Sequence, residues 1–274
     1  MNHLHRELAP IDGAAWEEID REARRTLHRT LAGRQLVDFS GPHGWSYSCV
    51  GSGRTKPLPE PLPGARAAAR EVRALIELTV PFRMARAELD AIARGAKDAD
   101  LTPVTHAART AALAEDRLVF NGFGAAGVRG ICEAGAGQAL TLTDDYEKYP
   151  KVVASALTWL RHHGIDGPYA IALGPRCYQG LTETVNRGGY PIIDLVKQQL
   201  DGRIVWAPAV DGAVVLSTRG GDFELIVGQD FSIGYASHDA GHVDLYVQET
   251  ITFAVYTPEA AVPLAYETAE KRSS

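Results

Sequence analysis

The chain has 274 residues, of which 45% are hydrophobic and 23% charged, with a formal net charge of -6. This composition is typical of a folded globular protein, and the negative charge argues against bulk attraction to nucleic acid or membranes. No apolar run approaches the roughly 20 residues that span a bilayer, and the start lacks a signal-peptide apolar region. Three scattered cysteines predict neither a disulfide framework nor a zinc cluster. We expect a cytoplasmic protein.

Residues 14–31 show the pattern of an amphipathic helix, because apolar side chains recur at steps of three and four. These side chains are Trp16, Ile19, Ala23, Leu27 and Leu31. Asp12 is expected to cap the start of the helix, and Gly33 to take the left-handed conformation after its end. The apolar stripe suits packing in a core, and it would also suit a bound partner.

A short alternating strand is predicted after Gly33, ending at a Gly-Pro turn. It leaves Arg34 and Asp38 four residues apart beside apolar neighbours. Such a pair is a poor arrangement for covalent chemistry and a good one for contacting an extended peptide. The alternative is a surface ion pair, worth less than about 1 kcal/mol.

Residues 49–64 contain four prolines at alternate positions, from Pro57 to Pro63. Proline lacks the backbone donor that a central strand needs and favours polyproline geometry. We therefore predict a long extended arm or loop that reaches from the body, with a disordered linker as the alternative. Residues 65–73 are helix-prone and lead into a strong strand.

The rest of the chain mixes helices and strands. Helical patterns occur at 84–94, 103–120, 149–163, 175–186 and 192–200, and strand patterns at 74–82, 169–173, 203–206, 213–217, 223–227 and 243–247. A glycine- and alanine-rich crossover lies at 122–137, and a polar tail after Leu264 is expected to fray. Together these patterns predict an α+β protein, with a mixed middle segment inserted into a body built from both ends of the chain.

Two short motifs resemble chemical sites. Residues 122–127 match the Gly-x-Gly-x-x-Gly dinucleotide fingerprint, but a helix precedes them, so a small-residue hinge is favoured. His238 and His242 lie near carboxylates, but their glycine-containing segment is expected to be a solvated hairpin turn rather than a metal site. The sequence contains no Glu-x-x-His pair, no Gly-x-Ser-x-Gly elbow and no phosphate-binding loop. We therefore predict neither an enzyme nor a metal centre.

Nine stretches resemble, in order, the shell protein of family 1 encapsulin nanocompartments, also called the linocin-like bacteriocin family. They are residues 4–11, 33–34 with 37–38, 41–45, 75–78, 88–90 with 94–95, 164–169, 219–223, 228–235 and 249–253. The resemblance covers nearly the full length. It implies an α+β fold like that of tailed-phage major capsid proteins, the Hong Kong 97-type fold, with a peripheral domain, an axial domain and an extended loop.

The resemblance also implies a division of the chain. Residues 1–48 correspond to an N-terminal helix and the start of the peripheral domain, and residues 49–75 to the extended loop. Residues 76–122 continue the peripheral domain with its long helix. Residues 123–218 correspond to the axial domain, and residues 219–274 to peripheral strands and a C-terminal tail.

By this resemblance the protein is a shell subunit that self-assembles into a hollow icosahedral homo-oligomer of about 60 copies. Family members enclose dye-decolourising peroxidases or ferritin-like proteins, which connects them with oxidative stress and iron storage. Each cargo docks through a short C-terminal targeting peptide. Arg34 and Asp38 match positions that contact this peptide, and we expect an apolar floor made of Leu27, Leu31, Phe231 and Ile233.

Small molecules enter such shells through pores. The loop that matches the family's five-fold pore consists of Asn186, Arg187, Gly188, Gly189 and Tyr190. Its glycines let backbones crowd around an axis, but some members carry histidine where Gly189 stands, so pore chemistry does not transfer. Some members hold a flavin against a tryptophan. The matching residue is Ala87, so we expect no cofactor, although Tyr190 remains.

Two alternative functions are a viral capsid protein and an antibacterial or peptidase activity. The shared fold allows a phage-type major capsid protein. Antibacterial and peptidase activities have been attached to the family's name, but the sequence offers no residues that support either.

Overall fold

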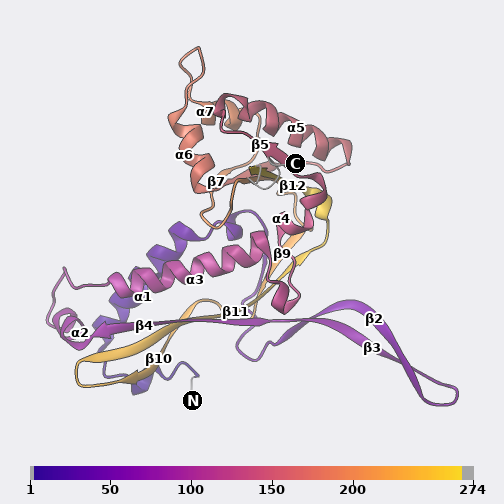
Figure 1. The fold of residues 1–274 in the computed structure, drawn as a ribbon. Helices are drawn as coiled ribbons and strands as arrows, with labels where there is room; N and C mark the ends of the chain where they lie inside the picture. Colours follow the sequence, from indigo (N-terminus) through magenta and orange to yellow (C-terminus); the bar gives the residue numbers. More distant parts are fainter. Residues whose placement is uncertain (1–2, 267–274) are drawn as a thin grey trace, which may run out of the picture.

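The computed structural model describes residues 3–266, which form two sheets, a long hairpin and the helices that cover the sheets (Figure 1). The first sheet has the order β1–β9–β11–β10, and β4 also pairs with β11. Its strands are β1 (Asp38–Ser40), β4 (Ile76–Ala85), β9 (Phe223–Val227), β10 (Ser232–His238) and β11 (His242–Val255). β9 and β10 pair with successive stretches of β11, and residues 228–231 between them interrupt the ladder.

The second sheet lies in the upper part of Figure 1 and has the order β5–β12–β8–β6–β7. Its strands are β5 (Leu140–Leu142), β6 (Tyr169–Leu173), β7 (Ile204–Trp206), β8 (Ala213–Ser217) and β12 (Ala261–Tyr266). All residues of β6 and β8 are buried, which explains their continuous apolar sequences. The expected α+β class agrees with this arrangement.

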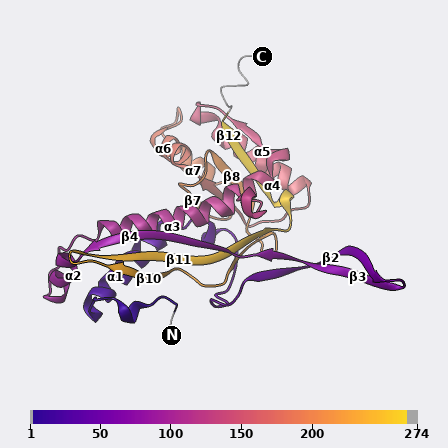
Figure 2. The ribbon, with the colours of Figure 1, turned by 60° about the horizontal axis from the view of Figure 1, so that its bottom comes forward.

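Three helices belong to the part built on the first sheet: α1 (Gly13–Thr30), α2 (Arg86–Ala93) and α3 (Thr102–Asn121). α3 lies along the sheet and α1 packs on α3, as Figure 2 shows from a second side. The apolar stripe of α1 enters this core, and the carboxylate of Asp12 accepts a hydrogen bond from the N–H of Ala15 at 2.7 Å. The predicted amphipathic helix and its cap are confirmed.

The second sheet is covered by α4 (Ile131–Ala134), α5 (Tyr149–His162), α6 (Pro175–Glu183) and α7 (Ile192–Lys197). Their apolar residues and the strands form the larger core cluster, which includes Tyr149, Leu160, Leu181 and Ile192. Between α6 and α7 the chain forms a narrow loop that projects from the top of Figure 1.

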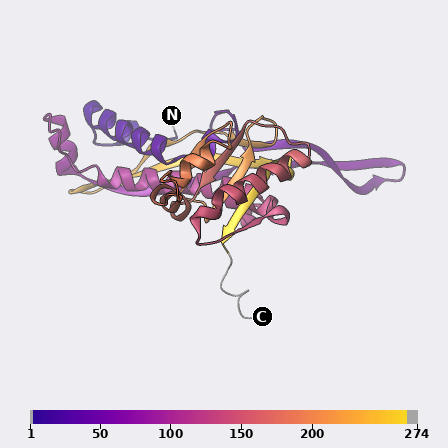
Figure 3. The same ribbon diagram turned by 90° about the horizontal axis from the view of Figure 1, so that it is seen from above.

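The proline-rich segment forms the strand β2 (Cys49–Leu62), which pairs with β3 (Ala65–Ala74) in a two-stranded antiparallel hairpin. The hairpin projects far from the body in Figures 1 and 3. Apolar side chains along it are left in solvent, with Leu58 48% and Leu62 68% exposed. The predicted extended arm is therefore present, and within one subunit its faces are not covered.

Several sequence-based expectations differ from the structure. Residues 65–73 form strand β3 rather than a helix, because the turn at Gly64, with φ 85°, brings them back beside β2. Gly33 does not adopt a left-handed conformation but begins a 3-10 turn, Gly33–Gln35. β12 within residues 219–274 joins the second sheet rather than the first. The tail was expected to fray after Leu264, but β12 continues to Tyr266, and residues 267–274 lie outside the described residues.

None of the helices described between residues 3 and 266 is long and apolar enough to cross a membrane.

Candidate functional site

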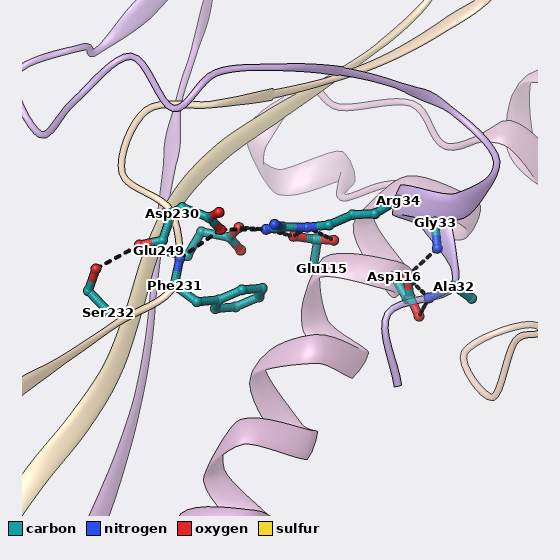
Figure 4. A network of polar contacts seen from close by, with 9 residues as sticks. All are labelled: Ala32, Gly33, Arg34, Glu115, Asp116, Asp230, Phe231, Ser232 and Glu249. Atoms are coloured by element: carbon teal, nitrogen blue, oxygen red, sulfur yellow. Dashed lines mark hydrogen bonds and ion pairs between the residues drawn. The ribbon is translucent and has the colours of Figure 1, made fainter. Parts of the chain in front are cut away.

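The 3-10 turn after α1 directs Arg34 into a group of carboxylates (Figure 4). Its guanidinium donates to Glu115 on α3 at 2.6 to 3.0 Å, to Glu249 on β11 at 2.6 Å and to Asp230 at 2.8 Å. Asp230 belongs to the segment that interrupts the ladder between β9 and β10. One arginine therefore joins α3, the central strand of the first sheet and the end of α1.

The network carries more negative than positive charge. The side chains of Glu115 and Glu249 are 0% exposed, and that of Arg34 is 19% exposed. Burial by itself lowers the pKa of Arg34, but hydrogen bonds to Glu115 and Asp230 outweigh it and raise that pKa, so the guanidinium stays charged. Burial, followed by the neighbouring Glu115, raises the pKa of Glu249. Its Oε2 atom is buried without a hydrogen-bond partner among the described residues.

A second buried carboxylate, Asp116, faces the end of α1. It accepts the backbone N–H of Gly33 at 2.8 Å and that of Ala32 at 3.0 Å. Burial raises the pKa of Asp116 to about 7, although these hydrogen bonds act in the opposite direction. The contact also explains the glycine: a Cβ at Gly33 would lie 3.1 Å from Asp116 Oδ1.

The structure does not bring Arg34 and Asp38 together. The carboxylate of Asp38 instead accepts the N–H of Gly221 at 2.6 Å, in the turn that connects β8 to β9. The alternative of an ion pair between these two residues is therefore not what the structure shows. Asp38 remains exposed, whereas Arg34 is engaged by three carboxylates. Direct contact of either residue with a cargo peptide stays a prediction.

A cavity of about 180 Å³ with both apolar and polar lining residues lies between α1 and β10. Three of the four residues predicted for an apolar floor line it: Leu27, Phe231 and Ile233. The fourth, Leu31, belongs to the same core cluster but does not line the cavity. Phe231 also lies against the network, with the Arg34 guanidinium 5.0 Å from the centre of its ring.

Several lining residues were missed from the sequence. They are Leu4, Arg6, Asp20, Ala23, Arg24, Ser232 and Val247. Arg6 and Asp20 form an ion pair at 2.9 Å, and Arg6 lies 3.9 Å from the centre of the Trp16 ring. The signal that the sequence did contain is the i, i+3 and i+4 spacing of Asp20, Ala23 and Arg24 on α1. Nothing local links this helix with residues 4 and 6.

The predicted pore loop is held by its own asparagine. The side-chain Oδ1 of Asn186 accepts the N–H groups of Gly188 at 2.9 Å and Tyr190 at 3.0 Å. Gly189 adopts φ 81°, which a side chain would disfavour, and Tyr190 is 64% exposed. The loop is therefore a defined turn with an exposed aromatic residue, at the tip of the projection between α6 and α7.

The other candidate motifs form turns. Residues 122–127 follow the long helix α3 and include a 3-10 turn, Gly124–Ala126, so the strand that a dinucleotide fingerprint needs is missing there. His238 and His242 flank the β10–β11 turn, where Asp239 accepts the N–H groups of Gly241 and His242. Within residues 3–266, no group of three or more histidine, cysteine or acidic side chains is arranged to hold a metal ion.

Two solved structures with a similar fold are a virus-like particle and a phage capsid. The virus-like particle from Pyrococcus furiosus matches with a TM-score of 0.63 and 18% identity, covering 90% of this chain and 98% of that chain. The capsid of Myoviridae phage XM1 matches with a TM-score of 0.52 and 10% identity, covering 86% of this chain and 90% of that chain. The fold is therefore that of tailed-phage major capsid proteins, with the extended arm as its loop.

Sequence comparison narrows this class. A family model described as "Encapsulating protein for peroxidase" matches residues 1–252. The chain is 56% identical over 270 residues to the type 1 encapsulin shell protein of Rhodospirillum rubrum, with 96% of each chain covered. It is 47% identical over 266 residues to the type 1 encapsulin shell protein of Mycobacterium tuberculosis, covering 97% of this chain and 100% of that protein. The chain belongs to the family of type 1 encapsulin shell proteins.

Proposed function

We propose that this protein assembles with copies of itself into a closed icosahedral shell in the bacterial cytoplasm, and that the shell encloses an enzyme. The observation that carries this proposal is the full-length match to encapsulin shell proteins on a capsid fold. In this proposal the protein is a container and not a catalyst. The rival function, a phage capsid protein, has only a similar fold in its favour, at 10% identity to the phage XM1 capsid, against 47–56% identity to the two shell proteins.

The arm supports assembly. A two-stranded hairpin is marginal by itself in water, and this one leaves Leu58, Leu62 and Val72 between 48% and 68% exposed. In a symmetric assembly a surface of a neighbouring copy can cover such residues. The double variant Leu58→Glu with Leu62→Glu should therefore yield subunits or fragments in place of shells. Glu60→Gln on the same strand is the matched control and should assemble normally. Complete shells from the double variant would show that the arm tip is not an interface.

The cavity between α1 and β10 is proposed as the docking place for the C-terminal tail of a peroxidase or ferritin-like cargo. Its floor of Leu27, Phe231 and Ile233 suits aliphatic side chains, and its polar rim suits the backbone of an extended peptide. The family description, which names a peroxidase, supports this kind of cargo. Arg34 acts in this proposal by holding Phe231 in place.

Co-purification tests the docking place. The shell is co-expressed with the product of the adjacent gene, with and without its last residues, and cargo per shell is measured. Phe231→Ala should reduce cargo per shell several-fold while shells remain intact. Ala236→Asp, at an exposed position of the same strand β10, is the control and should load normally. Undiminished loading by Phe231→Ala would remove the cavity from the proposal.

The loop at residues 186–190 is proposed to line a pore through which small molecules enter. Its support is the compact turn around Asn186 and the exposed position at the end of the subunit.

We further propose that the shell carries no flavin, since Ala87 offers no aromatic face for stacking. Flavin absorbance that stays with shells purified without cargo would contradict this.

A further inference from the structure

The N-terminal segment lies along the outer edge of β10. The carbonyl of Leu4 accepts the N–H of Tyr235 at 2.9 Å, which is the kind of bond that an added strand would make. The hydroxyl of Tyr246 donates to the carbonyl of His3 at 3.4 Å. The ring of His3 stacks on Trp45, with centroids 4.1 Å apart. Residues 3 and 4 therefore use the strand edge beside the cavity.

The side chains of this segment enter the cavity described above. Leu4 is 8% exposed and lines the cavity together with Leu27, Phe231 and Ile233. Two residues further, Arg6 donates two hydrogen bonds to Asp20 at 2.9 and 3.2 Å. An aliphatic side chain followed at the second position by a cation thus occupies the floor and the rim. The backbone makes these contacts through a turn, with His5 in a left-handed conformation before the 3-10 helix Arg6–Leu8.

The backbone of this segment is also strained at His5. Among residues 3–266, His5 is the non-glycine residue with a positive φ, at 50°. Its Nδ1 atom and Nε2 of His3 are buried without hydrogen-bond partners in the described part of the chain. Buried polar atoms without partners disfavour a conformation, so these features weaken the attachment that Leu4 and Arg6 provide.

We infer that residues 3–6 are the resident occupant of this cavity, and that an incoming peptide binds by displacing them. The incoming peptide takes over the N–H of Tyr235, places an aliphatic side chain where Leu4 lies, and presents a basic side chain to Asp20. The inference deepens the proposed docking of a cargo tail and rests on that proposal for the identity of the peptide. Displacement makes loading competitive, because each docked tail must free one N-terminal segment.

Hydrogen exchange tests whether the segment protects β10. In the double variant Leu4→Ala with Arg6→Ala, the Tyr235 amide loses its partner. Its hydrogen exchange, followed in the peptide covering residues 232–238, should accelerate by about tenfold or more. Glu7→Ala, at an exposed position of the same segment, is the control and should leave exchange unchanged. Arg6→Ala alone is a milder variant that should give an intermediate rate. Unchanged exchange in the double variant would overturn the inference.

A labelled synthetic peptide of residues 2–9 tests displacement directly. It is present while the shells reassemble, so passage through the wall does not limit binding. The double-variant shells should bind this peptide about tenfold more tightly than wild-type shells, and a Leu4→Asp peptide should bind neither. Equal binding to both kinds of shell, or no binding to either, would contradict displacement.

Cargo capture separates this inference from the proposal on which it rests. With the adjacent-gene product as cargo, the double variant should capture more cargo than wild type when cargo is limiting. If the synthetic peptide displaces residues 3–6 as expected but cargo capture does not depend on Phe231, the docking proposal fails and the inference about the resident segment stands. If capture depends on Phe231 but not on Leu4 and Arg6, the docking proposal stands and displacement fails.

Discussion

Replacing Arg34 with alanine removes the guanidinium that binds Glu115, Glu249 and Asp230. Both glutamate side chains are 0% exposed, so the variant leaves buried negative charge without its partner. Breaking a buried ion pair from one side costs about 3–5 kcal/mol. Asp230 is 41% exposed and adds little because water can solvate it. Arg34→Lys keeps the charge but not the several directed hydrogen bonds, so its cost should be smaller.

Thermal unfolding of purified shells, followed by tryptophan fluorescence, measures this cost. For a chain of this size, 3–5 kcal/mol corresponds to a lowering of Tm by about 10 °C at pH 8. The loss should shrink toward pH 5, because the pKa of Glu249 is raised by its burial and by Glu115, so protonation can relieve the unpaired charge. Arg83→Ala is the control, since Arg83 is 51% exposed and pairs at the surface.

Two results would refute the reasoning about Arg34. A Tm equal to that of wild type at pH 8 would mean that the buried carboxylates do not need the guanidinium. A loss that grows as the pH falls would mean that unpaired negative charge is not its cause. A comparable loss in Arg83→Ala would show that the effect is not specific to burial.

Three further predictions concern other residues. Burial raises the pKa of Asp116 to about 7 in the folded chain, against 3.8 ordinarily. Its contribution to the free energy of unfolding is therefore full below pH 4 and falls by up to about 4 kcal/mol as the pH rises through 7. Asp116→Asn should flatten this part of the Tm–pH profile, and an unchanged profile would exclude Asp116 as its source. Asp38→Ala loses the hydrogen bond to Gly221 and should lower stability by about 1 kcal/mol in denaturant titration; a loss above about 3 kcal/mol would point to an additional role. Arg187→Glu should slow entry of small anions into loaded shells, measured as turnover of enclosed enzyme at equal loading, and unchanged entry would mean that charge at this loop is irrelevant.

Local sequence patterns predicted the helices and many of the strands well. The spacing of Ile19, Ala23 and Leu27 fixes one face of α1, and the apolar runs of β6 and β8 report strands buried on both faces. Residues 65–73 were mistaken for a helix because alanine and arginine favour helices in isolation. Their pairing with β2 overrides this preference, and pairing between strands is not encoded in local composition.

The site was harder to predict because its members come from distant parts of the chain. The spacing of Arg34 and Asp38 suggested a pair, yet Arg34 turns toward Glu115 and Glu249, more than 80 positions away. Leu27, Phe231 and Ile233 were predicted as parts of one apolar floor, and they line one cavity. Leu4 and Arg6 reach the same cavity through the path of the N-terminal segment across β10, which no periodic pattern reveals.

The central claim is that this chain builds a closed shell. Size-exclusion chromatography with light scattering, combined with negative-stain images of the purified protein, tests it most directly. The expected result is a single species of about 60 subunits that appears as uniform hollow spheres. A protein that stays at the mass of a subunit or a dimer under mild conditions, with no spheres in the images, would contradict it.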